Sequence, residues 1–229
     1  MKKQNIEIYD DAIPKDLLKE IYLYYRFDHG WTFSKDQSDG SRVPITLGTE
    51  NSFYNFEYYD MKLFEILEQN WDVSRIGRTL SNCFRKGDAP EFHQDSTEIF
   101  EGKQDRTFIF YPNIEWEEEW GGHTLFKIIG EDGKEEIKKI YTKPGRLVIF
   151  DGNIWHNGSP CTDKMPNYIP GRFSVAFQEC EKDPDDEEVE DIEELDDKLT
   201  EVDGELIYDD DELHPQAKAE LKRVYGDEI

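Results

Sequence analysis

The sequence has few cysteines and no long apolar run, and both shortages exclude classes of protein. Its 229 residues include three cysteines, Cys83, Cys161 and Cys180, an odd number with no Cys-x-x-Cys pair. This usage argues against a disulfide framework and favours a reducing compartment, so we predict a cytoplasmic location. The segment after Met1 is interrupted by polar and acidic residues, which predicts neither a signal peptide nor a membrane span, and hence no membrane partner.

Positive charge is also scarce. The chain has 27 Lys and Arg against 53 Asp and Glu, a net charge of −26. Because nucleic-acid binding needs a positive surface, this balance argues against a DNA or RNA partner. The excess is concentrated at one end, since residues 179–229 hold 23 acidic and 5 basic residues, a net charge of −18. We therefore predict a folded domain over residues 1–178 and an acidic extension over residues 179–229.

The extension has a helical pattern. Val189, Ile192, Leu195 and Leu199 recur at helical spacing, and residues 215–225 begin with a proline and end before a glycine. These features predict an acidic helical C-terminal extension. Two roles stay open for it: a segment that packs on the domain or keeps it soluble, and an interaction segment for a basic partner.

The preceding region is rich in short apolar segments separated by turn residues. Helices are expected at residues 14–25 and 60–71, and strands at residues 5–9, 80–84, 91–95, 107–111, 124–129, 136–141, 146–150 and 172–178. Aromatic residues make up 14% of the chain, which suits a packed β core. The pattern predicts a mainly β fold with flanking helices, in which two antiparallel sheets form a jelly roll, the double-stranded β-helix.

Two histidines and one aspartate are the candidate metal ligands. His93 and Asp95 are two residues apart, so on a strand their side chains point to the same face. His156 lies downstream and would reach them from another strand. Two histidines with one carboxylate are the ligand set that holds ferrous iron on one face and leaves other positions open for oxygen chemistry.

A second pair, Arg172 and Ser174, also shares one face of an expected apolar strand. A guanidinium directed into an apolar interior is costly without an anionic partner, and its planar fork suits a carboxylate. One possible partner is an acidic residue of the chain itself, in a buried salt bridge. The other is the carboxylate of a bound ligand.

These motifs, in this order, resemble the iron- and 2-oxoglutarate-dependent dioxygenases, in particular the prolyl 4-hydroxylase-like branch. The resemblance covers roughly residues 5–178 and includes the segments 106–113, 120–126 and 143–150. It implies that His93, Asp95 and His156 bind Fe(II), and that Arg172 holds the distal carboxylate of 2-oxoglutarate with help from Ser174 and Tyr111. Catalysis would then depend on His93, Asp95, His156 and Arg172, with ascorbate as a reductant. Phe84 is a departure, because the family often has a hydroxyl-bearing tyrosine there.

The resemblance implies an enzyme that hydroxylates an unactivated C–H bond and releases succinate and CO2. The branch suggests a prolyl residue of a protein or peptide as the substrate. Two alternatives remain: a hydroxylase of a free amino acid or other small molecule, and a cupin-like metal-binding protein without oxygenase activity. The sequence does not define the substrate or the oligomeric state.

Overall fold

The computed structural model describes residues 4–31, 45–47, 58–73, 76–88, 90–96, 99–100, 103–130 and 133–179. Apart from Glu179, the acidic extension lies outside these residues, so its helices and the boundary at residue 178 stay predictions. Within the described part of the chain, no helix is long and apolar enough to cross a membrane.

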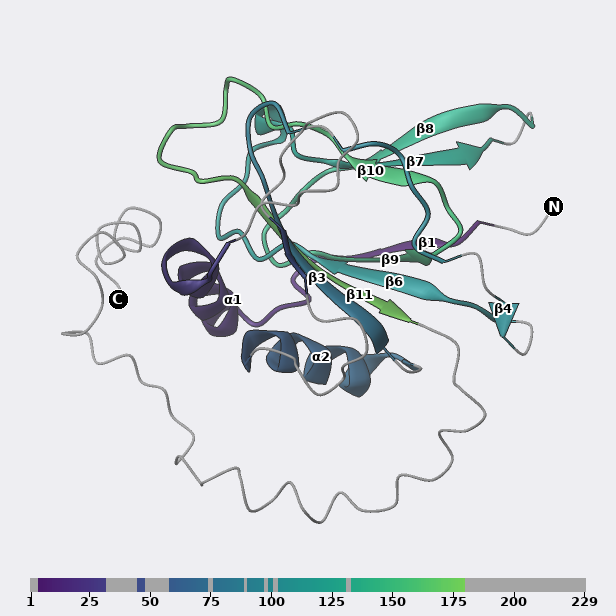
Figure 1. Cartoon of the computed structure of the whole chain (residues 1–229), viewed down its shortest axis with the longest axis horizontal. Coiled ribbons are helices and arrows are strands. Elements are labelled where there is room, and N and C mark those ends of the chain that lie inside the picture. The colour runs from purple at the N-terminus through teal and green to yellow at the C-terminus, as the bar shows by residue number, and fades with distance from the viewer. Residues whose placement is uncertain are drawn as a thin grey trace, which may run out of the picture. The chain divides into compact units, whose positions relative to one another are not determined.

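A six-stranded antiparallel sheet forms the larger layer of the domain (Figure 1). Its strands, in spatial order, are β1 (Ile6–Tyr9), β9 (Leu147–Asp151), β6 (Arg106–Phe110), β11 (Arg172–Glu179), β3 (Ile76–Phe84) and β2 (Ile45–Leu47). The long pairing of β11 with β3 sets Arg172 opposite Phe84 and Ser174 opposite Asn82. The sheet therefore fixes the position of Arg172 at one end of a central strand.

A smaller sheet faces the larger one. It consists of β10 (His156–Gly158), β7 (Thr124–Ile129) and β8 (Glu135–Ile140), in that spatial order. A single antiparallel bridge joins His93 to His156 of β10. A separate ribbon pairs β4 (Ile99–Phe100) with β5 (Lys103–Gln104).

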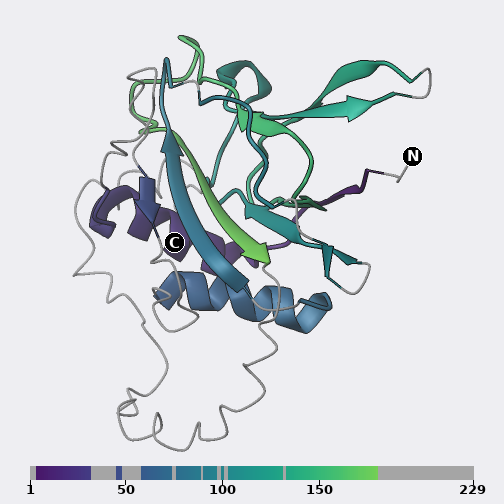
Figure 2. The same ribbon diagram turned by 45° about the vertical axis from the view of Figure 1, so that its right-hand side comes forward.

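Two helices cover the side of the large sheet that faces away from the small sheet (Figures 1 and 2). They are α1 (Lys15–Leu23), which continues as the π-helical turn η1 (Tyr24–Asp28), and α2 (Tyr58–Asn70); a short 3-10 turn, η3 (Glu118–Trp120), precedes β7. Phe173 and Phe177 of β11 point toward this layer, where they contact Tyr22 and Phe64. Because successive strand residues alternate between faces, Arg172 and Ser174 point the other way, toward the small sheet.

The interior between the sheets is apolar. Its buried residues are Ile109, Tyr111, Phe126, Ile140, Val148, Phe150, Ile154 and Ala176. The predicted mainly β jelly roll with flanking helices is thus confirmed. Both predicted helices are present, and β7 has the predicted bounds.

The strand predicted at residues 91–95 is wrong. That segment makes only the bridge at His93, and the chain then bends, so that Asp95 and Ser96 donate their amide hydrogens to the carbonyl of Gly152. Strand β10 was missed because three residues are too few for an alternating pattern. The tertiary position of one loop beside β10, rather than local strand propensity, therefore sets the orientation of His93 and Asp95.

Candidate active site

The backbone brings His93 and His156 side by side, although 62 other residues separate them in the sequence. The amide of each donates to the carbonyl of the other, with both N···O distances 2.9 Å. Residues paired in this way point to the same side of a sheet, and the two imidazole centroids are 4.4 Å apart. Phe126 and Phe150 pack against the ring of His156 and fix it from the core side.

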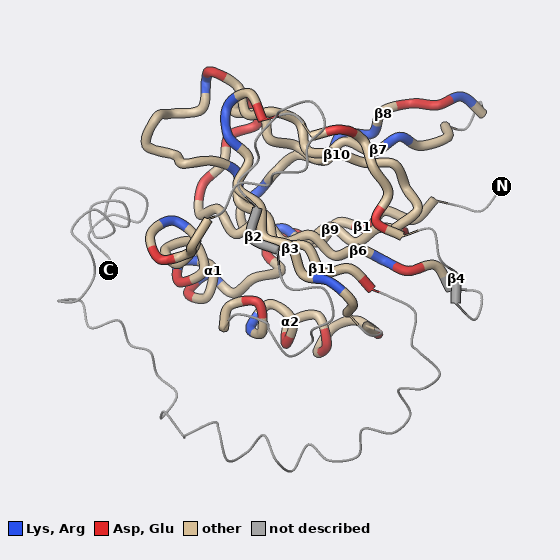
Figure 3. The backbone as a smooth tube through the Cα atoms, viewed as in Figure 1, with Lys and Arg blue, Asp and Glu red and all other residues tan. Residues whose placement is uncertain are grey.

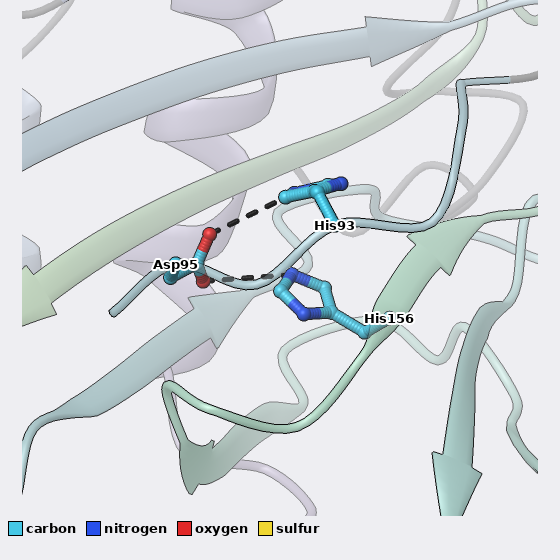
Figure 4. Close-up of side chains that lie close together, drawn as sticks. All are labelled: His93, Asp95 and His156. Carbon is cyan, nitrogen blue, oxygen red and sulfur yellow. Dashed lines mark ion pairs between the residues drawn. The ribbon is translucent and has the colours of Figure 1, made fainter. Parts of the chain in front are cut away.

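Asp95 completes the group (Figure 4). Its Oδ1 lies 3.7 Å from Nε2 of His93, and its Oδ2 lies 3.5 Å from Nε2 of His156. Across the described residues, these three are the group of His, Cys, Asp and Glu side chains whose ligand atoms converge, all within 4.8 Å of one another. The side chains of Asp95 and His156 are 5% and 6% exposed, whereas that of His93 is 54% exposed, so the site opens on the His93 side.

The hydrogen bonds of the two histidines define their tautomers. Nδ1 of His93 lies 3.1 Å from the carbonyl oxygen of Glu91, and Nδ1 of His156 lies 3.0 Å from that of Ile154. A carbonyl oxygen can only accept, so each Nδ1 carries a hydrogen, which leaves Nε2 as the ring nitrogen that can bind a metal. Burial lowers the pKa of His156, which favours its neutral form. A metal cation stabilises a carboxylate and two imidazole nitrogens brought this close together.

Thr107 on β6 supports the carboxylate. Its Oγ1 donates to Oδ2 of Asp95 at 2.6 Å, and Thr107 is 1% exposed. A ligating carboxylate is commonly oriented by such an outer hydrogen bond. The geometry therefore supplies both a ligand set and the groups that hold it in place.

Arg172 lies further along the same interior. It is 2% exposed, and its buried Nε has no hydrogen-bond partner. Among the described residues no carboxylate pairs with it, and burial lowers the pKa of its guanidinium. A salt bridge to an acid of the chain, one of the two partners that the sequence left open, is thus absent from the described residues. The charge remains available to a bound anion.

Aromatic rings and close backbone shape the space around the guanidinium. Its carbon lies 4.2 Å from the ring centroid of Phe84 and 5.4 Å from that of Tyr111. A Cβ at Gly158 would come within 2.8 Å of both Nη2 of Arg172 and the Phe84 ring, so only glycine fits. Phe84, the departure from the family pattern, therefore contributes a cation–π contact where a tyrosine would also offer a hydroxyl.

Tyr111 is fully buried, and its hydroxyl lies 2.6 Å from Oγ1 of Thr124. Burial raises the pKa of this phenol, so the hydroxyl stays protonated and able to donate. Ser174 is 3% exposed and lies two residues from Arg172 on the same face of β11. The three residues predicted to contact the cosubstrate thus line one interior with the three predicted metal ligands.

Sequence reasoning assigned no role to Thr107 or Thr124. Each hydroxyl contacts a side chain outside its own sheet, on the loop at residue 95 for Thr107 and at residue 111 for Thr124, so packing rather than local sequence sets these contacts. No local pattern marks such threonines, which are common in strands for their β-branched shape alone.

Comparison with known proteins finds a family model that is similar to the part of the chain holding these residues. The sequence model of the 2OG-Fe(II) oxygenase superfamily matches residues 79–177. No curated protein matches the chain by sequence.

Several solved structures share the fold. A prolyl-4-hydroxylase from Pseudomonas putida is 15% identical, with a TM-score of 0.51 over 79% of this chain and 95% of its own. A prolyl hydroxylase from Trichoplax adhaerens, in complex with a hypoxia inducible factor oxygen degradation domain peptide fragment, is 14% identical, with a TM-score of 0.52 over 76% of this chain and 82% of its own. HygX from Streptomyces hygroscopicus, with nickel and 2-oxoglutarate bound, is 9% identical, with a TM-score of 0.51 over 76% and 82%.

The matched segment begins within β3 and ends within β11, so it spans both sheets and includes His93, Asp95, His156 and Arg172. The fold shared with the prolyl hydroxylases agrees with this match. Residues 79–177 are accordingly similar to the 2OG-Fe(II) oxygenase superfamily, and the domain shares its fold with prolyl-4-hydroxylases.

Proposed function

We propose that this protein hydroxylates a prolyl residue of a protein or peptide, with Fe(II) and 2-oxoglutarate as cofactor and cosubstrate. His93, Asp95 and His156 would hold the iron. The observation that carries this assignment is the convergence of two imidazole Nε2 atoms on one carboxylate, at 3.5 and 3.7 Å. Imidazole and carboxylate together suit ferrous iron, and three ligands on one side leave positions for other groups.

Arg172, Ser174 and Tyr111 would bind 2-oxoglutarate. Gly158, where an added Cβ would clash with the guanidinium of Arg172, is two residues from His156 on β10, a separation of about 7 Å along a strand. A short dicarboxylate could thus reach the metal ligands with one end while its other carboxylate meets the guanidinium. The unpartnered Nε of Arg172 and the 2-oxoglutarate bound in the HygX neighbour support this placement.

Each side chain would have a defined part. Thr107 keeps the carboxylate of Asp95 in position, and the carbonyls of Glu91 and Ile154 accept from the two Nδ1 atoms and so orient both rings with Nε2 toward Asp95. Phe84 and the apolar interior exclude water from the guanidinium, which strengthens its attraction for an anion. Bound iron and 2-oxoglutarate would supply the dioxygen chemistry that attack on an unactivated C–H bond needs, with ascorbate as reductant.

A macromolecular substrate fits the open side of the site. The side chain of His93 is 54% exposed, so a residue of a larger molecule could reach the proposed metal site from solvent. The Trichoplax neighbour, which holds a peptide, gives independent support for a peptide substrate.

The test combines binding and turnover. Mn(II) and 2-oxoglutarate should bind the oxygen-free protein. With Fe(II), oxygen and a library of proline-containing peptides, succinate should then form together with a peptide that has gained one oxygen atom at proline. Asp95→Ala should abolish both products, because it removes the charged ligand. Hydroxylation of free proline but no peptide would replace this proposal with the small-molecule alternative. Absence of 2-oxoglutarate binding would refute both.

We also propose a reducing, cytoplasmic setting. Cys83 and Cys161 are both buried free thiols, and burial raises the pKa of the Cys83 thiol to about 12. Such thiols stay protonated and unreactive.

A further inference from the structure

Strand β8 forms one edge of the small sheet. It pairs with β7, and among the described residues no strand or bridge occupies its other side. Figures 1 and 2 show the β7–β8 hairpin projecting from the rest of the domain, with β8 as its outer strand. An edge strand presents unpaired amide and carbonyl groups to which another strand can add.

The hydrogen-bond pattern identifies which groups are free. The amide of Gly130 donates to the carbonyl of Lys134, so this residue pair is hydrogen-bonded across the hairpin. Hydrogen-bonded and non-hydrogen-bonded pairs alternate along an antiparallel ladder. In β8, Glu136, Lys138 and Ile140 therefore bond toward β7, and Glu135, Ile137 and Lys139 direct their main-chain groups to the free edge. The amide of Lys127, opposite Ile137, donates instead to the carbonyl of Trp155, as this alternation requires.

The order of charges along this edge is self-complementary. Two glutamates precede Ile137 and two lysines follow it, Glu135-Glu136-Ile137-Lys138-Lys139; Figure 3 colours these charges. All five side chains except that of Lys138 are exposed, and Ile137 is 52% exposed. An antiparallel copy centred on Ile137 reverses the order, so that every acidic residue faces a basic one.

We propose that β8 pairs with β8 of a second copy of this chain, antiparallel and centred on Ile137. The register sets Glu135 opposite Lys139 and Glu136 opposite Lys138, each twice by symmetry, with the two Ile137 residues in contact. It also aligns the free main-chain groups, which make roughly six hydrogen bonds. The two sheets become one six-stranded sheet with a two-fold axis, the commonest symmetry for a homo-oligomer.

Charge selects this register from its neighbours. Hydrogen bonding allows slips only in steps of two, because a strand shifted by one presents groups that already bond to β7. The allowed slip in one direction sets Glu136 opposite Glu136 and Lys134 opposite Lys138. The slip in the other direction sets Lys138 opposite Lys138. Like charges directly opposite are destabilising and opposite charges are stabilising, so the pairing centred on Ile137 is favoured.

The outer face of the sheet adds apolar contact area. Ile137 and Ile129 lie on this face and are 52% and 47% exposed. In the paired sheet the isoleucines of the two copies form one apolar band across the axis. The contact is small, so we expect a dimer with a micromolar dissociation constant. The net charge of −26 opposes association at low salt, and moderate salt should relieve that repulsion while leaving the close pairs largely intact.

Sedimentation velocity of the full chain, from low micromolar to near-millimolar concentration, tests the proposal. The wild type should dimerise. Lys138→Glu/Lys139→Glu surrounds Ile137 with four acidic residues, and should raise the dissociation constant at least about 100-fold, which corresponds to roughly 2.8 kcal/mol. Glu135→Lys/Glu136→Lys should do the same with four basic residues.

An equimolar mixture of the two charge variants is the decisive experiment. The acidic β8 of one variant then faces the basic β8 of the other, so a heterodimer should form. Lys62→Glu/Lys164→Glu changes the net charge by the same amount as the acidic variant, but at lysines outside β8, and should leave the wild-type dimer intact. Retained binding of 2-oxoglutarate by every variant would show that the fold is unchanged.

Amide hydrogen exchange gives a residue-specific readout. Protection at Glu135, Ile137 and Lys139 should increase with protein concentration, whereas Glu136 and Lys138, already bonded to β7, should be protected throughout. A wild type that stays monomeric, a dimer that survives the acidic variant, or a mixture that does not associate would each overturn the proposal.

Discussion

Arg172 offers the sharpest test of the site, because its charge is buried and its Nε lacks a hydrogen-bond partner. The change Arg172→Met keeps the length and apolar stem of the side chain and removes the charge. We expect the variant to fold and to bind metal, but to lose most of its affinity for 2-oxoglutarate. The loss of a charge-assisted contact in a dry pocket costs roughly 2–5 kcal/mol, which corresponds to an affinity loss of about 30-fold or more.

Two effects oppose each other in the unliganded protein. Removal of an unpaired buried charge is stabilising, because its desolvation is costly. Loss of the contact with Phe84, 4.2 Å from the guanidinium carbon, removes about 2 kcal/mol of cation–π attraction. The free energy of unfolding without ligand should therefore stay within about 1–2 kcal/mol of the wild-type value.

Thermal unfolding with and without 2-oxoglutarate, in the presence of Mn(II), separates the two roles. At a concentration about 100 times its dissociation constant, the ligand should stabilise the wild type by about 2.7 kcal/mol, or roughly 5–10 °C in Tm. At the same concentration, a variant with 30-fold weaker binding should gain only about 0.9 kcal/mol, or roughly 2–4 °C in Tm. Arg78→Met, at an exposed position of β3, is the matched control and should keep the full shift.

Two results would refute this reasoning. An Arg172→Met protein with the wild-type ligand-induced shift would show that the guanidinium does not hold the cosubstrate. A variant that loses several kcal/mol of stability without ligand would show that Arg172 is a structural residue, with a partner that the change removed.

Three further outcomes are expected. Thr107→Val removes the hydroxyl that donates to the proposed acidic ligand, and should weaken metal binding about 10- to 100-fold in a metal titration; Thr79→Val, which removes a buried hydroxyl without a hydrogen-bond partner, should leave binding unchanged. The Arg146 guanidinium holds the pKa of Asp10 at about 2, below its usual 3.8, so Asp10→Asn should cost less than about 1 kcal/mol in urea unfolding above pH 4, a difference that disappears as the pH falls through about 2. A chain that ends at residue 181 should keep metal and 2-oxoglutarate binding. A chain that ends at residue 178 also lacks Glu179, whose buried carboxylate accepts three hydrogen bonds from one β6 arginine. Its free energy of unfolding should be lower by roughly 3 kcal/mol.

The sequence alone determined the class of fold and the identity of the candidate ligands. Short apolar segments such as 124–129 are local features, bounded by turn residues, and the predicted bounds of this strand are correct. Arg172 and Ser174 were also predictable as a pair, because a real strand carries them. The residue types of His93, Asp95 and His156 also indicated a metal site, because two imidazoles and one carboxylate are a known set of iron ligands.

Only the tertiary structure decided how these residues meet. His93 and Asp95 do not lie on a strand, and their convergence depends on the bridge to His156 and on the carbonyl of Gly152. The role of Phe84 depends on the register of β3 with β11, and the roles of Thr107 and Thr124 depend on how loops and sheets pack together. The free edge of β8 also depends on the tertiary structure. The order of its charges can be read from the sequence, but its register with β7 decides which of its main-chain groups remain free. Local periodicity is a property of neighbouring residues, whereas a site is a property of strands brought together by the packing of the whole domain.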